Sequence, residues 1–155
     1  MVLTSHAIVG AALASVIPKY PLAGFVLGFA SHFILDAIPH WDYQLRSSRK
    51  DLKNRLNDDL IIGPDFYLDL LKISLDLAVG FVLAFFIFGS FFWGMVGAVL
   101  PDLLQFVYFK ARKTPLKYLQ RFHRFVHADE DCVGPVWGIA IQVLLVLFIV
   151  IILKQ

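Results

Sequence analysis

Charge and cysteine are both scarce in this sequence of 155 residues. Charged residues make up 17% and hydrophobic residues 59%, whereas a soluble domain has about 25% charged and roughly 45–50% apolar residues. The single cysteine, Cys132, excludes an intrachain disulfide and a cysteine-based zinc motif. No Lys or Arg precedes Lys19, so the N-terminus lacks the basic region of a cleavable signal peptide. The net charge of +2 is too small to indicate nucleic-acid binding.

Long uncharged stretches are, by contrast, abundant. A helix needs ~20 apolar residues to cross a bilayer core, and several stretches meet or approach this length. We expect spans near residues 21–38, 67–88, 91–109 and 133–153, and a shorter segment near 3–17 that either spans or re-enters the membrane. The sequence therefore predicts a single all-α membrane domain covering residues 1–155, a polytopic helical bundle with four or five transmembrane helices.

Basic residues are concentrated in two polar connections, residues 41–66 and 110–131. Connections rich in Lys and Arg usually stay on the cytoplasmic side of a membrane. We therefore expect both connections and the N-terminus to face the cytoplasm, with the C-terminus outside. Residues 116–128 alternate aromatic and basic side chains in a way that is typical of an amphipathic helix at the membrane surface. The predicted location is the cell membrane, which is the inner membrane if the protein is bacterial.

Histidine and aspartate recur within or beside the predicted spans, where ionisable residues are costly and usually functional. On the predicted topology these residues lie near the cytoplasmic face: His6, His32, Asp36, Asp69, Asp76, Asp102, His123 and His127. His32 and Asp36 are four residues apart and share a helix face, as do His123 and His127. Because the topology is inferred from Lys and Arg alone, the gathering of His and Asp is independent evidence for one site.

Imidazole and carboxylate groups together suit zinc, and also manganese or iron. We predict a site for a divalent transition metal, zinc being favoured, with these ligands: His6, His32, Asp36, Asp102, His123 and His127. Asp76 has no evident charge partner and is the predicted general base or a further ligand. Arg124 is predicted to hold a substrate phosphate. Structural roles stay open for Asp69, which could pair with Lys72, and for His40, which could belong only to the turn after its helix.

Four short motifs follow one another over most of the chain. They are Thr4-Ser5-His6 with Gly10, Gly28-x-x-Ser31-His32-x-x-x-Asp36, Gly97-x-x-x-Pro101-Asp102 and His123-Arg124-x-x-His127. Together they resemble the membrane-bound metal-dependent hydrolase family, small inner-membrane proteins related to the LexA-regulated hydrolase. The pair His32 and Asp36 is also similar, more distantly, to one in zinc-dependent phospholipases C. The family often has Asp-His after Pro-Asp, where this chain has Leu103-Leu104, so potential ligands are absent.

The resemblance implies hydrolysis of an ester, plausibly a phosphoester, in a lipid or another membrane-associated substrate at the cytoplasmic face. A non-catalytic metal-binding membrane protein, a small transporter and a proton relay are alternatives, because intramembrane Asp and His serve those roles too. A haem-binding bundle with paired histidines is a further alternative. The apolar outer halves of the predicted spans disfavour a transport path. The expected partners are membrane lipid and no nucleic acid.

Overall fold

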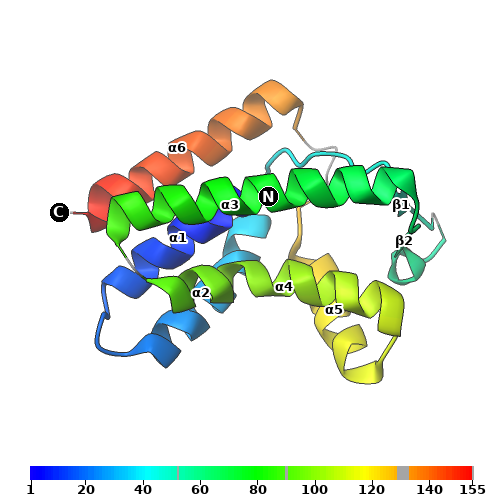
Figure 1. Cartoon of the computed structure of the whole chain (residues 1–155), viewed down its shortest axis with the longest axis horizontal. Helices are drawn as coiled ribbons and strands as arrows, with labels where there is room; N and C mark the ends of the chain where they lie inside the picture. Colours follow the sequence, from blue (N-terminus) through cyan, green and yellow to red (C-terminus); the bar gives the residue numbers. More distant parts are fainter. Residues whose placement is uncertain (52, 90, 129–132, 155) are drawn as a thin grey trace.

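The computed structural model describes residues 1–51, 53–89, 91–128 and 133–154, and these form a helical bundle (Figure 1). Its helices are α1 (Leu3–Ser15), α2 (Pro21–Asp36), α3 (Pro64–Phe88), α4 (Phe92–Ala111), α5 (Thr114–Val126) and α6 (Pro135–Leu153). Two short strands, β1 (Ser48–Arg49) and β2 (Asp59–Leu60), pair antiparallel, with a 3₁₀ turn at Arg55–Asn57 between them. The predicted all-α bundle is confirmed. The predicted connection 110–131 contains α5, while its residues 129–131, like Cys132, lie outside the described residues.

Proline and glycine set several helix ends. Helices α2, α3, α5 and α6 each have proline in the first or second position, where its missing N–H costs no helical hydrogen bond. Helix α3 begins at Pro64, three residues before the predicted start at 67. It ends at Phe88, and the next residue is Gly89, whose φ of 85° is easily adopted by a residue without a Cβ.

Three helices, α3, α4 and α6, are long and apolar enough to cross a membrane. The other apolar helices are shorter. With 13 and 16 residues, α1 and α2 are about 20 and 24 Å long, against ~30 Å for a bilayer core. They form a hairpin whose open end carries Leu3 and Asp36, both of which are buried.

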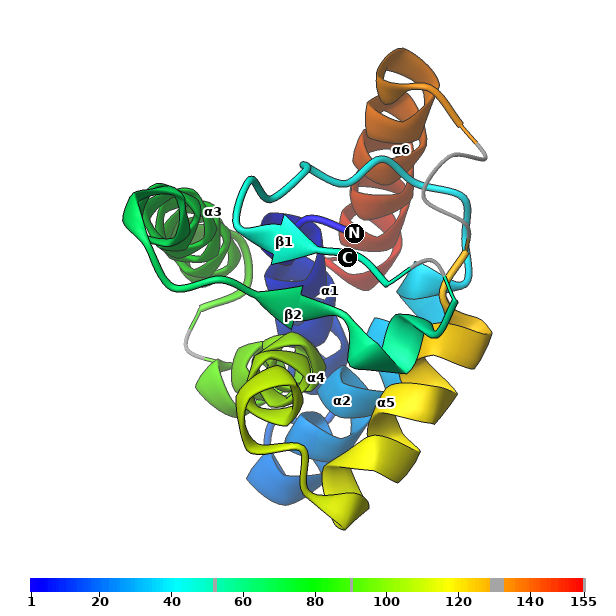
Figure 2. The ribbon, with the colours of Figure 1, turned by 90° about the vertical axis from the view of Figure 1, so that its right-hand side faces the viewer.

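Helix α1 occupies the centre and packs against α2, α3, α4 and α6 (Figure 2). The β-strands and α5 lie at one end of the molecule, and the C-terminus lies at the other (Figure 1). The described parts of the two basic connections therefore lie toward the same end of the bundle. Helix α5 packs on α2 and α4 from that end.

Glycines let α1, α2 and α4 approach one another at backbone distance. A Cβ added to Gly10 or Gly28 would overlap the carbonyl oxygen of Gly94, and one added to Gly97 would overlap that of Phe25. Small residues permit this close approach between membrane helices. The approach brings side chains from the three helices within reach of one another.

Candidate metal centre

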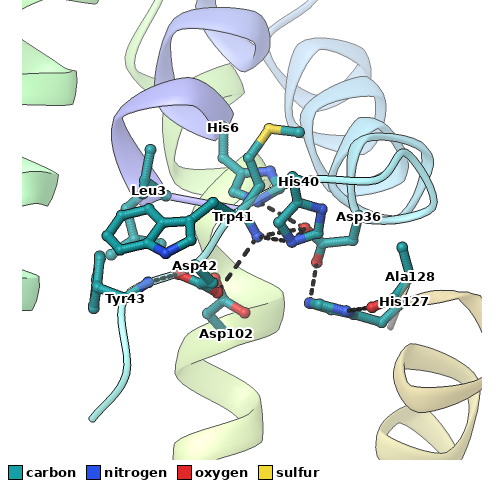
Figure 3. A network of polar contacts seen from close by, with 12 residues as sticks. Leu3, His6, Asp36, His40, Trp41, Asp42, Tyr43, Asp102, His127 and Ala128 are labelled. Atoms are coloured by element: carbon teal, nitrogen blue, oxygen red, sulfur yellow. Dashed lines mark hydrogen bonds and ion pairs between the residues drawn. The ribbon is translucent and has the colours of Figure 1, made fainter. Parts of the chain in front are cut away.

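All five histidines of the sequence surround one carboxylate, that of Asp36. Asp36 ends α2 and is 1% exposed. The Nε2 atoms of His32 and His123 both lie 3.0 Å from its Oδ2, and Nε2 of His6 lies 3.1 Å from its Oδ1. Nε2 of His127 is 3.9 Å from Oδ2, and Nε2 of His40 is 4.0 Å from Oδ1. Figure 3 shows His6, His40 and His127 gathered around Asp36.

Three of these histidines are oriented by backbone carbonyl groups. Nδ1 of His32 lies 2.8 Å from Ala98 O, Nδ1 of His40 lies 2.7 Å from Ile38 O, and Nδ1 of His127 lies 2.7 Å from Ala128 O. Since a carbonyl only accepts, Nδ1–H is the donor in each pair, and the neutral ring then keeps its lone pair on Nε2. Histidines that bind metals are held in this manner by their second nitrogen.

Local structure helps to position two of these histidines. Pro101 lies inside α4, where its missing N–H leaves the carbonyl of Gly97 without a helical donor, and Ala98, whose carbonyl His32 contacts, is the next residue. At the end of α5, Ala128 N donates to Asp36 O at 2.7 Å, which fastens the segment carrying His127 to the end of α2. Pro39 lies in the turn after α2, directly before His40.

His6 provides a test of whether these residues fit a metal. Its side chain is fully buried at 0% exposure. Among the described residues, neither of its ring nitrogens makes a hydrogen bond. Nε2 is close to Asp36 Oδ1, at 3.1 Å, but the direction is not that of a hydrogen bond. A buried imidazole without a partner is costly, and a metal ion bound at Asp36 would satisfy the lone pair of one of its nitrogens. His6 belongs to neither of the two groups of ligand atoms, so the fit to a metal rests on the other histidines, Asp36 and Asp102.

The ligand atoms form two overlapping groups. One contains His32, Asp36, Asp102 and His123, and the other contains Asp36, His40 and His127; within each group the atoms lie within 4.8 Å of one another. Ligands placed tetrahedrally around zinc at about 2.0–2.1 Å are roughly 3.3–3.4 Å apart. Nε2 of His32 lies 3.0 Å from the Asp36 carboxylate, 3.2 Å from His123 Nε2 and 3.6 Å from Asp102 Oδ1, which brackets that separation.

The α-amino group of Met1 also enters the centre. It lies 3.0 Å from Asp36 Oδ1, 2.7 Å from His40 Nε2 and 3.6 Å from Asp42 Oδ2. Burial, with the positive charge of this amino group, lowers the pKa of His40 to about 4. His40 is therefore a neutral ligand-type imidazole at pH 7.

Asp76 lies outside both groups, and its contacts are structural. Its Oδ2 accepts from Leu3 N at 2.7 Å, and its Oδ1 accepts from Thr4 N at 3.2 Å and Thr4 Oγ1 at 2.6 Å. An anion at a helix N-terminus satisfies unpaired N–H groups and the helix dipole. Asp76 has no evident partner in the sequence, but in the structure it caps α1 from the neighbouring α3.

Asp69 and Arg124 are also separate from the ligand groups. Asp69 Oδ2 accepts from Ser47 N and Ser47 Oγ, both at 2.8 Å, and its Oδ1 lies 3.2 Å from Lys72 Nζ. The structural alternative for Asp69 is therefore the one its contacts favour. Arg124 is half-buried and follows His123 on α5.

The sequence interpretation left two residues of this region unassigned. His40 continues the four-residue steps of His32 and Asp36, a signal that Pro39 obscured because it ends the helix. Gln120 lies one turn before His123 and is 2% exposed. Its Nε2 has no hydrogen-bond partner among the described residues.

Comparison with known proteins gives no match, whether the chain is set against family models, curated proteins or solved structures. The structural findings are thus a membrane-type helical bundle and a buried His and Asp group able to hold a metal ion.

Proposed function

We propose that the protein is a membrane-embedded, metal-dependent hydrolase of an ester, preferably a phosphoester, in a membrane-associated substrate. The observation that supports the proposal best is the placement of five histidine Nε2 atoms within 4.0 Å of the Asp36 carboxylate. Zinc suits the nitrogen and oxygen donors, with manganese or iron as alternatives. The chemistry that such an ion supplies is a water of lowered pKa and a polarised phosphoryl oxygen.

The proposed roles of the protein groups follow from their exposure. His6, His32, Asp36 and His123 are buried and suit ligation. The side chains of Asp102 and Asp42 are 34% and 37% exposed, so water reaches them. Asp42, which belongs to neither ligand group, is the proposed group that takes a proton from the attacking water, because Asp76 is engaged at the N-terminus of α1. Arg124 is the proposed phosphate contact, since guanidinium pairs well with phosphate oxygens.

The proposed location of the centre is just below the cytoplasmic surface. The end of the bundle with both basic connections is the cytoplasmic end by the positive-inside rule. Trp41, next to His40, packs on Gly138, about 5 Å below the start of α6 at 1.5 Å rise per residue. Labelling of single cysteines introduced at positions 46–55 from each side of the membrane tests this orientation.

Elemental analysis of detergent-purified protein tests the metal. We expect wild type to hold a transition metal and His32→Ala and His127→Ala to lose most of it, because an incomplete ligand shell binds weakly. Asp65→Asn, which changes an exposed carboxylate on α3, should hold as much metal as wild type. Unchanged metal in both histidine variants would overturn the assignment.

Turnover of a panel of lipid and soluble phosphoesters and carboxylic esters, with and without chelator, tests the hydrolase. We expect chelator-sensitive hydrolysis that disappears in His32→Ala. If the metal-loaded protein hydrolyses nothing above the chelated control, the hydrolase proposal is wrong and a non-catalytic metal-binding role replaces it.

A further inference from the structure

An apolar groove of about 330 Å³ runs between α1 and α6. Its walls include Val2, Ile8, Trp41, Ile139, Val143 and Leu147. Helix α6 packs mainly against α1 and stands at the margin of the bundle (Figure 2). The groove follows the line along which these two helices meet.

The groove faces the surroundings of α6. Ile139, Val143 and Leu147 are 46%, 51% and 50% exposed although all three are aliphatic. They belong to the 19-residue helix α6, 18 residues of which have a mean hydropathy of 3.0, so that it is long and apolar enough to cross a membrane. In a bilayer, hydrocarbon chains surround such a helix and have lateral access to the groove.

One end of the groove, at Val2 and Trp41, is lined by the residues that follow Met1 and His40 of the candidate metal centre. Val2 follows Met1, whose amino group lies 3.0 Å from Asp36 Oδ1, and Trp41 follows His40. Gln142 joins these two walls, because its Oε1 accepts from Val2 N at 3.2 Å and its Nε2 donates to Trp41 O at 2.6 Å. A molecule lying in the groove would thus have one end beside Met1 and His40 and its apolar body between α1 and α6.

We propose that this groove holds one acyl chain of a phospholipid and presents the headgroup phosphoester to the Asp36 centre. The fate of the headgroup depends on the proposed function, whereas occupation of the groove by an acyl chain does not. A protein helix is a poor occupant, since 330 Å³ equals a cube of about 7 Å edge and a helix with side chains is about 10 Å across. The lining also offers a polar substrate few partners along its length.

Cross-linking with a phospholipid carrying a photoreactive group in its acyl chain tests the occupant in reconstituted vesicles. Lipid around the protein will label the exposed faces of α3 and α6. Label on α1, within Val2–Ile8, is diagnostic, because Ser5 and Ile8 are buried except where they line the groove. We expect wild type to be labelled there. In Val143→Trp the larger side chain fills the groove, and labelling should fall about tenfold, which is the loss of affinity expected when one or two methylene groups of the acyl chain are no longer buried.

The matched control is Leu144→Trp. Leu144 is the next residue on α6, is 66% exposed and does not line the groove, so its variant should keep the α1 label. Ile139→Trp fills the groove one turn away and covers the case in which Val143→Trp does not fold. Equal α1 labelling in wild type and in both groove-filling variants, or none in wild type, would overturn the acyl-chain proposal.

Hydrolysis separates this proposal from the proposed function. Val143→Trp should lose activity on a long-chain phospholipid and retain it on a short soluble phosphoester, whose reaction needs the centre only. If wild type hydrolyses neither substrate but α1 is labelled as expected, the hydrolase is wrong and the groove stands. If both substrates react equally in both proteins, the centre stands and the groove does not select the substrate.

Discussion

The interior of the bundle and its outer helices use opposite ways of packing. Nearly all of α1 is buried, and its backbone approaches that of α4 at glycine. In α3 and α6, by contrast, only 11% of the residues in the most apolar 18-residue stretch are buried. Large side chains such as Phe86 and Leu144 are exposed. Close packing of α1, α2 and α4 thus brings the candidate metal ligands together, whereas α3 and α6 expose large apolar side chains. His6, His32 and Asp36 therefore lie on helices that are shorter than the three long enough to cross a membrane.

The largest effect is expected where the interior is tightest. Gly28→Leu would force a side chain into the carbonyl of Gly94 and should destabilise the fold by about 3 kcal/mol or more, at or above the upper range for overpacking. Thermal unfolding in detergent, followed by helical circular dichroism, measures the loss.

Gly63→Ala is the matched control, because a Cβ at Gly63 meets nothing within 4 Å. It should unfold close to the wild-type temperature. A Gly28→Leu protein as stable as Gly63→Ala would show that the backbones of α2 and α4 are not in contact, and the contrast between interior and outer helices would lose its basis.

An intermediate effect is expected for Asp76, which joins an outer helix to the interior. Asp76→Asn weakens the anionic cap on Leu3 N and Thr4 N and should cost about 1–2 kcal/mol. Bound metal should be unchanged, because Asp76 is in neither ligand group. Thermal unfolding and elemental analysis of one preparation test both points, with Asp65→Asn as control. A fall in metal content at unchanged stability would return Asp76 to the metal centre.

The smallest effect is expected at the exposed end of the bundle. Lys110 Nζ lies 2.8 Å from Asp59 Oδ1, and this hydrogen bond lowers the pKa of Asp59. A carboxyl group whose pKa is lower in the folded state than in the unfolded state stabilises the fold at pH values above the unfolded-state pKa of about 4. This contribution disappears as the pH falls through the lower pKa of the folded state. Because both side chains are partly exposed to screening solvent, Asp59→Asn should cost less than about 1 kcal/mol at pH 7.

Unfolding temperatures of wild type and Asp59→Asn, compared at pH 7 and then at decreasing pH below 4, provide the measurement. The difference between the two proteins should shrink as the wild-type carboxylate is protonated. A difference that grows on acidification would contradict the sign of the effect.

Asp36 and Asp76 show where sequence reasoning succeeded and where it stopped. Both are carboxylates within predicted spans, which is what makes both of them candidates in the sequence. For Asp36, the four-residue spacing from His32 was enough to predict a shared face, because this geometry is internal to one helix. For Asp76, the deciding partners are Leu3 and Thr4, more than seventy residues away. No local pattern contains that contact.

The sequence by itself determined that the chain is helical and membrane-type, since long uncharged apolar runs and proline-marked starts act locally. It also determined which residue types could bind a metal. Only the tertiary structure decided that His40 lies beside Asp36, that Asp76 caps α1, and that Gln142 ties α6 to the edge of the centre. The physical reason is that these contacts depend on how closely distant helices approach, and that distance is fixed by glycines that meet only once the chain has folded.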